Sequence, residues 1–302
     1  YLLKENEFEC LFPRGEKLSS IDTIRDTLKV IDLEGLRNIN KNIMKKAIKN
    51  KVFNDGTIDG YTVAAIDGTK IFGSKKKNCS KCLSLEINNK IHYYHSVAVM
   101  SLVGSGHNLV LDYEMYNCKI DSSKKDEGEL NVSKRLLSRV ISQHRNFIDI
   151  VTYDALACNS KFINHCIEEG VDTVIRVKKN NNNSIKEVKR SVNKKEISEI
   201  WNDKSEKIFV SEEIFYMKGV DKPLRYVKFM KRKSALEYSQ ILIVTTCTEM
   251  KLKTLYKIIK ARWEIENGIF NTLKNEASLG HCFVHGGNAV EAILYCIFIA
   301  SN

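Results

Sequence analysis

Proline and long apolar runs are what this sequence has least of. Only 2 of its 302 residues are proline, and the chain shows no internal repeat or long low-complexity tract, which excludes a repeat architecture. The most apolar stretch, AVEAILYCIFIA from Ala289, is too short to span a bilayer and predicts a buried helix. Because no N-terminal signal sequence is visible either, we expect a cytoplasmic protein without a membrane partner.

Acidic residues are outnumbered by basic ones. The chain has 48 Lys and Arg against 37 Asp and Glu, a formal charge of +11, and the surplus is spread along the sequence. This favours a polyanionic partner, with nucleic acid first, although charge alone does not exclude a basic protein without one. Nine cysteines in such a chain indicate a reduced setting instead of a disulfide framework. Since the sequence begins at Tyr1 without methionine and stops inside an apolar run, we expect residues to be missing at both ends.

The order of the predicted elements indicates one α/β fold. Helical periodicity from Ser19 to about Asn50, with Ser20 or Asp22 as the first cap, is followed by a buried strand in YTVAAIDG that ends at Asp67. The next elements are two strands joined by an Asn-Asn turn in LSLEINNKIHYYHSVAVMSLV, a strand in HNLVLDYEMYN, a helix in DEGELNVSKRLLSRVISQH, a strand in NFIDIVTYDAL that ends at Asp154, a helix in SKFINHCIEEG closed by Gly170, and a strand in DTVIRVKK.

Three hairpin-type strands followed by helix, strand, helix and strand match the ribonuclease-H-like plan, a mixed sheet flanked by helices. We predict a helical N-terminal lead-in (1–55), a catalytic core (56–179 and 246–302) and a polar, strand-like β-rich insertion (180–245). In this plan the first and fourth strands lie side by side. Asp67 and Asp154 should therefore be close together.

The segment RWEIENGIFNTLKN, from Arg262, contains Glu266, a third acid of interest after Asp67 and Asp154. Wound as an α-helix, it places Arg262 and Glu266 in the middle of an apolar stripe, whereas Glu264 points to the opposite, lysine-rich side. A charge aimed at a core must be paired or bind a metal. For a single helix, an ion pair between Arg262 and Glu266 at i,i+4 spacing explains the pattern without any site.

Together, Asp67, Asp154 and Glu266 are more informative than each alone. Asp-Gly after a strand is most often a turn, and strand-end aspartates commonly cap the next helix. Three converging carboxylates, however, repel one another unless they hold divalent cations. Hard Mg²⁺ or Mn²⁺ ions with oxygen ligands fit that arrangement.

The chain resembles the DDE transposases of bacterial insertion sequences, in the branch with a β-rich insertion before the last catalytic acid. The resemblance rests on AIDGTKIFGS, YDALACN followed by a helix and VIRVKKN, and RWEIEN followed by FNTLKN. It implies that Asp67, Asp154 and Glu266 are the catalytic triad and bind two Mg²⁺ or Mn²⁺ ions. Arg262 matches the family pattern, while the tyrosine lies a turn early at Tyr256 and the lysine one residue late at Lys274.

The resemblance also implies the function: water releases a 3′-hydroxyl at the element's end, and that hydroxyl attacks target DNA in line. The expected partners are the terminal inverted repeats, target DNA and a second copy of the chain when assembled on DNA at the nucleoid. Candidate DNA contacts are Arg262, Lys274, Tyr256, Lys178 and Lys179. Two alternatives stay open: an inactive DNA-binding remnant and a ribonuclease-H-like nuclease without strand transfer.

A second possible metal site involves cysteine. Cys79 and Cys82 form CSKC, and His92 and His95 follow in HYYH, an order that suggests zinc. On a strand, however, the two histidines would point to opposite faces, which argues against both binding one ion. Spacing alone favours a CSKC loop without zinc. His281, Cys282 and His285 raise the same question with less support.

Overall fold

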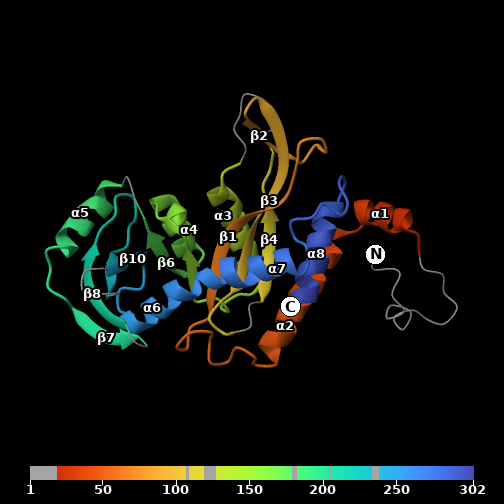
Figure 1. The fold of residues 1–302 in the computed structure, drawn as a ribbon. Coiled ribbons are helices and arrows are strands. Elements are labelled where there is room, and N and C mark those ends of the chain that lie inside the picture. The colour runs from red at the N-terminus through yellow and green to blue at the C-terminus, as the bar shows by residue number, and fades with distance from the viewer. Residues whose placement is uncertain (1–18, 107–108, 119–126, 179–181, 204–205, 233–237) are drawn as a thin grey trace.

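A ten-stranded sheet forms the centre of the molecule (Figure 1). The computed structural model describes residues 19–106, 109–118, 127–178, 182–203, 206–232 and 238–302. The strands run in the order β2-β3-β1-β5-β6-β10-β9-β8-β7, and β4 pairs with β3. Their bounds are β1 Val63–Ser74, β2 Leu83–Ile87, β3 Lys90–Leu102, β4 Val110–Met115, β5 Ile150–Tyr153, β6 Asp172–Val177, β7 Glu199–Asp203, β8 Glu206–Phe215, β9 Leu224–Arg232 and β10 Tyr238–Thr245.

The predicted ribonuclease-H-like order is confirmed. β1, β3 and β4 form the antiparallel part, and β1, β5 and β6 the parallel part. Asn88 and Asn89 both have positive φ, as a two-residue turn that matches strand twist requires. One prediction was wrong: β1 does not end at Asp67 but continues to Ser74, because β3 pairs with it up to Tyr93.

The segment after β6 also differs from its predicted strand-like character. It begins with the helix α5 (Asn183–Val192), whose buried Ile185, Val188 and Val192 recur at helical spacing. The strands β7 to β10 follow, and β10 pairs with β6, with Val244 opposite Ile175. Because of this pairing, the inserted strands are hydrogen-bonded into the central sheet and extend it.

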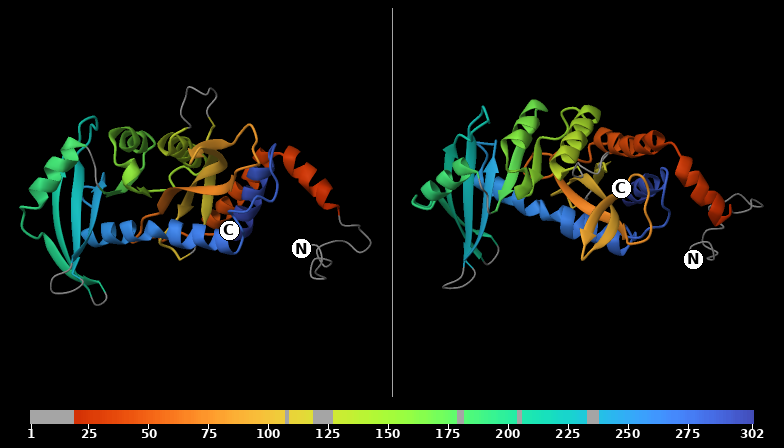
Figure 2. Two further views of the ribbon diagram at one scale, coloured as in Figure 1. Left: turned by 45° about the horizontal axis from the view of Figure 1, so that its top comes forward. Right: turned by 90° about the horizontal axis from the view of Figure 1, so that it is seen from above.

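Helices cover the sheet on both sides (Figure 2). α3 (Glu129–Gln143) and α4 (Ser160–Glu168) pack on one face through an apolar layer that includes Ala64 and Ile66 of β1. α6 (Leu252–Ala261), the helical segment η4 (Ile265–Phe270) and α7 (Asn271–Asn275) pack on the other, against a layer that includes Val63 and Ala65. Successive residues of β1 thus alternate between the two layers.

The predicted helical lead-in is present as α1 (Ile21–Val30) and α2 (Leu33–Lys49), and Ser20 caps α1 as expected. α2 packs against α8 (Ala289–Ser301), the helix predicted from the apolar run near the end. α8 and the other helices within the described ranges are not long and apolar enough to cross a membrane.

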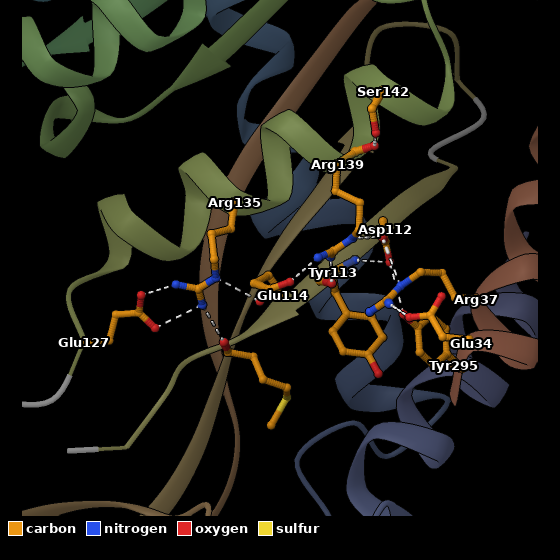
Figure 3. Close-up of polar contacts among 11 residues, drawn as sticks. Glu34, Arg37, Asp112, Tyr113, Glu114, Glu127, Arg135, Arg139, Ser142 and Tyr295 are labelled. Carbon is orange, nitrogen blue, oxygen red and sulfur yellow. Dashed lines mark hydrogen bonds and ion pairs between the residues drawn. The ribbon is translucent and has the colours of Figure 1, made fainter. Parts of the chain in front are cut away.

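Buried Asp112 on β4 ties the lead-in to the core (Figure 3). Its Oδ2 lies 2.7 Å from Arg139 Nε of α3 and 3.5 Å from Arg37 Nε of α2. The hydroxyl of Tyr295 on α8 is 3.3 Å from its other oxygen. A buried carboxylate needs such partners, so this one side chain joins three helices to the sheet edge.

Candidate active site

Asp67 and Asp154 stand on neighbouring parallel strands. β1 and β5 pair with Ala65 opposite Thr152, so two further residues along each strand bring Asp67 level with Asp154. Asp67 shares the face of Ala65, which belongs to the apolar layer beneath α6 and η4. Asp154 follows β5 directly, and its Oδ1 accepts a 2.8 Å hydrogen bond from the Leu156 amide. The predicted apposition of these two strands is confirmed.

Glu266 enters the same face from η4. The sequence predicted a regular α-helix, but Ile265–Phe270 is a π-helical turn, a feature found frequently at functional sites. The wider turn rotates Glu266 out of the apolar stripe, and its side chain is 43% exposed. Arg262 keeps its predicted buried position at 3% exposure, with Nη1 2.7 Å from Glu266 Oε1. Arg262 Nε has no hydrogen-bond partner among the described residues.

The electrostatics of Asp67 show that the carboxylates interact. Burial raises the pKa of Asp67 to about 7, and the negative charge of Glu266 adds to this rise. The Gly68 amide donates a 2.9 Å hydrogen bond to Asp67 Oδ1 and opposes it, as does the positive charge of Arg262. A nearby cation would therefore favour the charged form of Asp67.

Arg176 is a member of this group that sequence reasoning missed. It lies on β6, where Ile175 is opposite Tyr153 of β5, so Arg176 is level with Asp154. Its guanidinium lies 4.7 Å from the ring centre of Trp263. Burial lowers the pKa of Arg176, and nearby Arg262 lowers it further, while Glu266 and Asp154 attract its charge. The sequence signal that could have identified Arg176 is a single charged residue between the apolar Ile175 and Val177 of a buried strand.

Glu129, the first residue of α3, is a fourth carboxylate near Asp67. Tyr153 Oη donates a 2.8 Å hydrogen bond to Glu129 Oε1, and the Glu129 charge also raises the pKa of Asp67. Gly68 makes room for it, because a Cβ there would lie 2.7 Å from Tyr116 Oη and 3.0 Å from Glu129 Cδ. From the sequence, Glu129 is an ordinary acidic residue in the first turn of a predicted helix, and nothing in its local pattern indicates that it lies near Asp67.

The chemistry of these acids fits hard divalent cations, although Asp67, Asp154 and Glu266 do not form one of the close metal-ligating groups found among the described residues. Asp67 is near Glu266 and Glu129, whose charges raise its pKa. Mg²⁺ and Mn²⁺ prefer such ligands. A cation at Asp67 would oppose both the burial and the Glu266 charge that raise its pKa to about 7.

Glu264 is not the freely solvated residue that the helical projection predicted. Its Oε2 accepts a 2.7 Å hydrogen bond from the Gly104 amide, in the connection between β3 and β4. The helix face opposite the apolar stripe contacts that connection, so Glu264 has a structural partner of its own.

The candidate DNA contacts lie in different surroundings. Lys178 Nζ is 4.0 Å from Asp154 Oδ2 and thus borders the carboxylates. Lys274 is exposed on α7, 5.9 Å from the Phe270 ring. Tyr256 is buried, and its hydroxyl bonds to Asp203, a position that offers DNA little access. Lys179 lies outside the described residues.

The cysteine loop belongs to the one group of metal-ligating side chains that the structure brings together within the described residues. Cys79 and Cys82 Sγ atoms are 3.7 Å apart, and His95 of HYYH faces them. His92 is not part of the group, as its odd separation from His95 predicted. His285, from the other end of the chain, completes it.

Comparisons with known proteins concern the family and the fold. The sequence model described as "Transposase DDE domain" matches residues 58–302. No match was found among curated proteins.

Two solved structures show only weak similarity. A piggyBac transposase synaptic complex with hairpin DNA is 15% identical over 93% of this chain, with a TM-score of 0.46, and this chain spans about half (52%) of that one. Endonuclease V from Bacillus subtilis is 10% identical over 72% of this chain and 83% of its own, with a TM-score of 0.32. The family match, which takes in all three acids, identifies the chain as a member of the transposase DDE domain family.

Proposed function

We propose that this chain is the catalytic region of a DNA transposase of the insertion-sequence type. It would hydrolyse a phosphodiester bond at the element's end and join the freed 3′-hydroxyl to target DNA. The observation that carries the proposal is the electrostatic coupling of Asp67 to Glu266 on the face that Asp154 shares, within the matched family domain. Membership of the family supports transposition chemistry in general.

Asp67, Asp154 and Glu266 are the proposed ligands of two Mg²⁺ or Mn²⁺ ions. When bound, such ions activate water and stabilise the leaving alkoxide. The protein's own part is to hold the carboxylates in place. Arg262 fixes Glu266 through its 2.7 Å ion pair, and the Leu156 amide orients Asp154.

Positive charge beside the acids would position the DNA backbone. Arg176 and Lys178 lie next to Asp154 on β6 and just after it, and Lys274 is exposed on α7. The formal charge of +11 favours a polyanionic partner. We further propose that two copies act together on paired inverted repeats, because joining both element ends to one target requires two sites.

The test compares the parent chain with Glu266→Gln and its matched control Glu264→Gln on labelled DNA carrying the flanking inverted repeats. Both substitutions remove one charge from the same helical segment, and a glutamine at 264 can still accept the Gly104 hydrogen bond. We expect Mg²⁺-dependent nicking and joining by the parent and the 264 variant, and loss of both reactions in the 266 variant.

Equal activity of all three proteins would contradict the assignment of Glu266. Cleavage without a joined product would identify a nuclease, and DNA binding without any reaction would identify an inactive remnant. Asp154→Asn provides a second test, since it should abolish the reaction while leaving the buried pair between Arg262 and Glu266 intact.

A further inference from the structure

Four metal-ligating side chains from distant parts of the sequence meet beside β3. Cys79 and Cys82 come from the loop between β1 and β2, His95 from β3, and His285 from the segment between α7 and α8. Their ligating atoms all lie within 4.8 Å of one another. The group shares no residue with the carboxylate site, and its sulfur and nitrogen ligands have a different metal preference.

The separations of these atoms match the edges of a tetrahedron. The two Sγ atoms are 3.7 Å apart, and His95 Nε2 is 3.5 Å from Cys79 Sγ and 3.4 Å from Cys82 Sγ. His285 Nε2 is 3.4 Å from Cys82 Sγ and 3.2 Å from His95 Nε2.

Zinc bound by two cysteines and two histidines would require nearly the same distances. With Zn–S bonds of about 2.3 Å and Zn–N bonds of about 2.05 Å, a regular tetrahedron has edges of about 3.8 Å for S–S, about 3.6 Å for S–N and about 3.3 Å for N–N. Five of the six separations agree with these values to about 0.2 Å, and the sixth, between Cys79 and His285, is within 4.8 Å. Two thiolates and two imidazoles in this geometry select zinc over Mg²⁺.

A disulfide between Cys79 and Cys82 explains less of the arrangement. It would bring the sulfurs to about 2.05 Å, compared with the 3.7 Å found. It would also give no reason for two imidazole Nε2 atoms, one of them 203 residues away from Cys82 in sequence, to approach the same pair of sulfurs.

The group is partly buried, with His95 in the interior and the other three ligands half-exposed. His95 is 2% exposed, and the Phe72 ring packs against both imidazoles, with centroids 6.1 Å from His95 and 5.0 Å from His285. Nearby Cys282 bonds instead to the Val284 carbonyl. The Phe72 ring thus helps to hold both imidazoles in place.

We infer that Cys79, Cys82, His95 and His285 bind one structural zinc ion that fastens the segment after the catalytic helix to the central sheet. Cys82 and His285 are 203 residues apart in sequence, so the bond would close a very long loop. The ion pair between Lys81 and Glu291 of α8, at 2.8 Å, joins the same two regions. The zinc thus holds the segment that follows Glu266 against the strand pair that carries Asp67.

The experiment measures metal content and coordination in the full chain, purified under reducing conditions. Elemental analysis should give one zinc per chain in the parent, and Co²⁺ substitution should give the thiolate charge-transfer and tetrahedral d–d bands. Cys82→Ser and His285→Gln should weaken zinc binding by more than the roughly 10- to 100-fold that losing a partner of a metal ligand costs. The matched controls Cys282→Ser and His92→Gln should bind zinc like the parent.

The parent protein alone also decides the question if the ligand variants fail to fold. X-ray absorption at the zinc edge should show two sulfur and two nitrogen neighbours, and chelation by phenanthroline should lower the thermal unfolding midpoint. The inference is overturned if the reduced parent neither retains zinc nor takes it up on reconstitution. It is equally overturned if the zinc neighbours are oxygen atoms, or if the control variants lose as much zinc as the ligand variants.

Discussion

His144, the residue that ends α3, should make the stability of this protein depend on pH. Its side chain is 4% exposed, and neither ring nitrogen has a hydrogen-bond partner among the described residues. Burial lowers the pKa of His144 from 6.5 to about 4, and the positive charges of Lys41 and Lys45 on α2 contribute to the decrease. The folded protein therefore keeps this imidazole neutral over a range in which the unfolded chain protonates it.

The sign and the size follow from proton linkage. Between pH 6.5 and about 4 the unfolded state binds more protons at His144 than the folded state, so the free energy of unfolding falls as the pH falls. The contribution is fully present above pH 6.5 and is lost progressively below it. Integration of the two titrations gives a loss of about 2.5 kcal/mol at pH 4.5, a maximum that any ordering of water around the ring would reduce.

Urea denaturation of the parent and of His144→Leu at pH 7.5 and pH 4.5 measures this contribution. We expect the variant to lose about 2.5 kcal/mol less than the parent between these two conditions, because leucine fills the site without a proton to bind. Lys45→Met retains the imidazole but removes one of the positive charges that lower its pKa. This variant should therefore also lose less stability than the parent between the two pH values, by a smaller amount than His144→Leu. Equal losses in the parent and in His144→Leu would refute the reasoning.

Two further substitutions test the packing around the site. Gly68→Ala should lower DNA cleavage with binding retained, because its Cβ would meet Tyr116 Oη at 2.7 Å and Glu129 Cδ at 3.0 Å and displace these side chains beside Asp67. Gly73→Ala on the same strand has no atom nearer than 3.9 Å and should stay active, so equal activity of the two variants in a cleavage assay would contradict this. Asp112→Asn should lower the free energy of unfolding by about 2 kcal/mol, since it removes the buried negative charge between Arg139 and Arg37, although each arginine keeps one other carboxylate partner. Glu127→Gln, which faces the half-exposed Arg135, should cost under about 1 kcal/mol in the same urea titration.

Local signals predicted much of the fold. Two asparagines between alternating strands fixed a hairpin that the structure confirms at Asn88 and Asn89, because few residues other than glycine tolerate positive φ in such a turn. Strand order then placed Asp67 beside Asp154. This inference worked because β1 and β5 are parallel neighbours, so residues equally far along both strands lie level, even though β1 continues past Asp67 to Ser74.

Long-range and irregular features could not be predicted in this way. The π-helical turn around Glu266 has the same residue types as a regular helix, so periodicity alone predicts the wrong rotation. His285 reaches the cysteine loop only through tertiary packing, and spacing within CSKC and HYYH carries no information about it. Glu129 has an ordinary local role in the first turn of its helix, which concealed its position beside Asp67.

Glu266 shows how one side chain can meet two opposing electrostatic requirements. Arg262 carries a full charge into an apolar layer at 3% exposure, and its pair with Glu266 Oε1 is the compensation that a buried charge needs. The same Glu266 charge repels Asp67 and helps to hold the pKa of that acid near 7. A carboxylate has two oxygens, so Glu266 can keep Oε1 on Arg262 while Oε2 binds a cation that Asp67 also needs. The ion pair, which by itself suggested a purely structural role, is thus compatible with metal binding, and the π-helical turn supplies the exposure that the second oxygen requires.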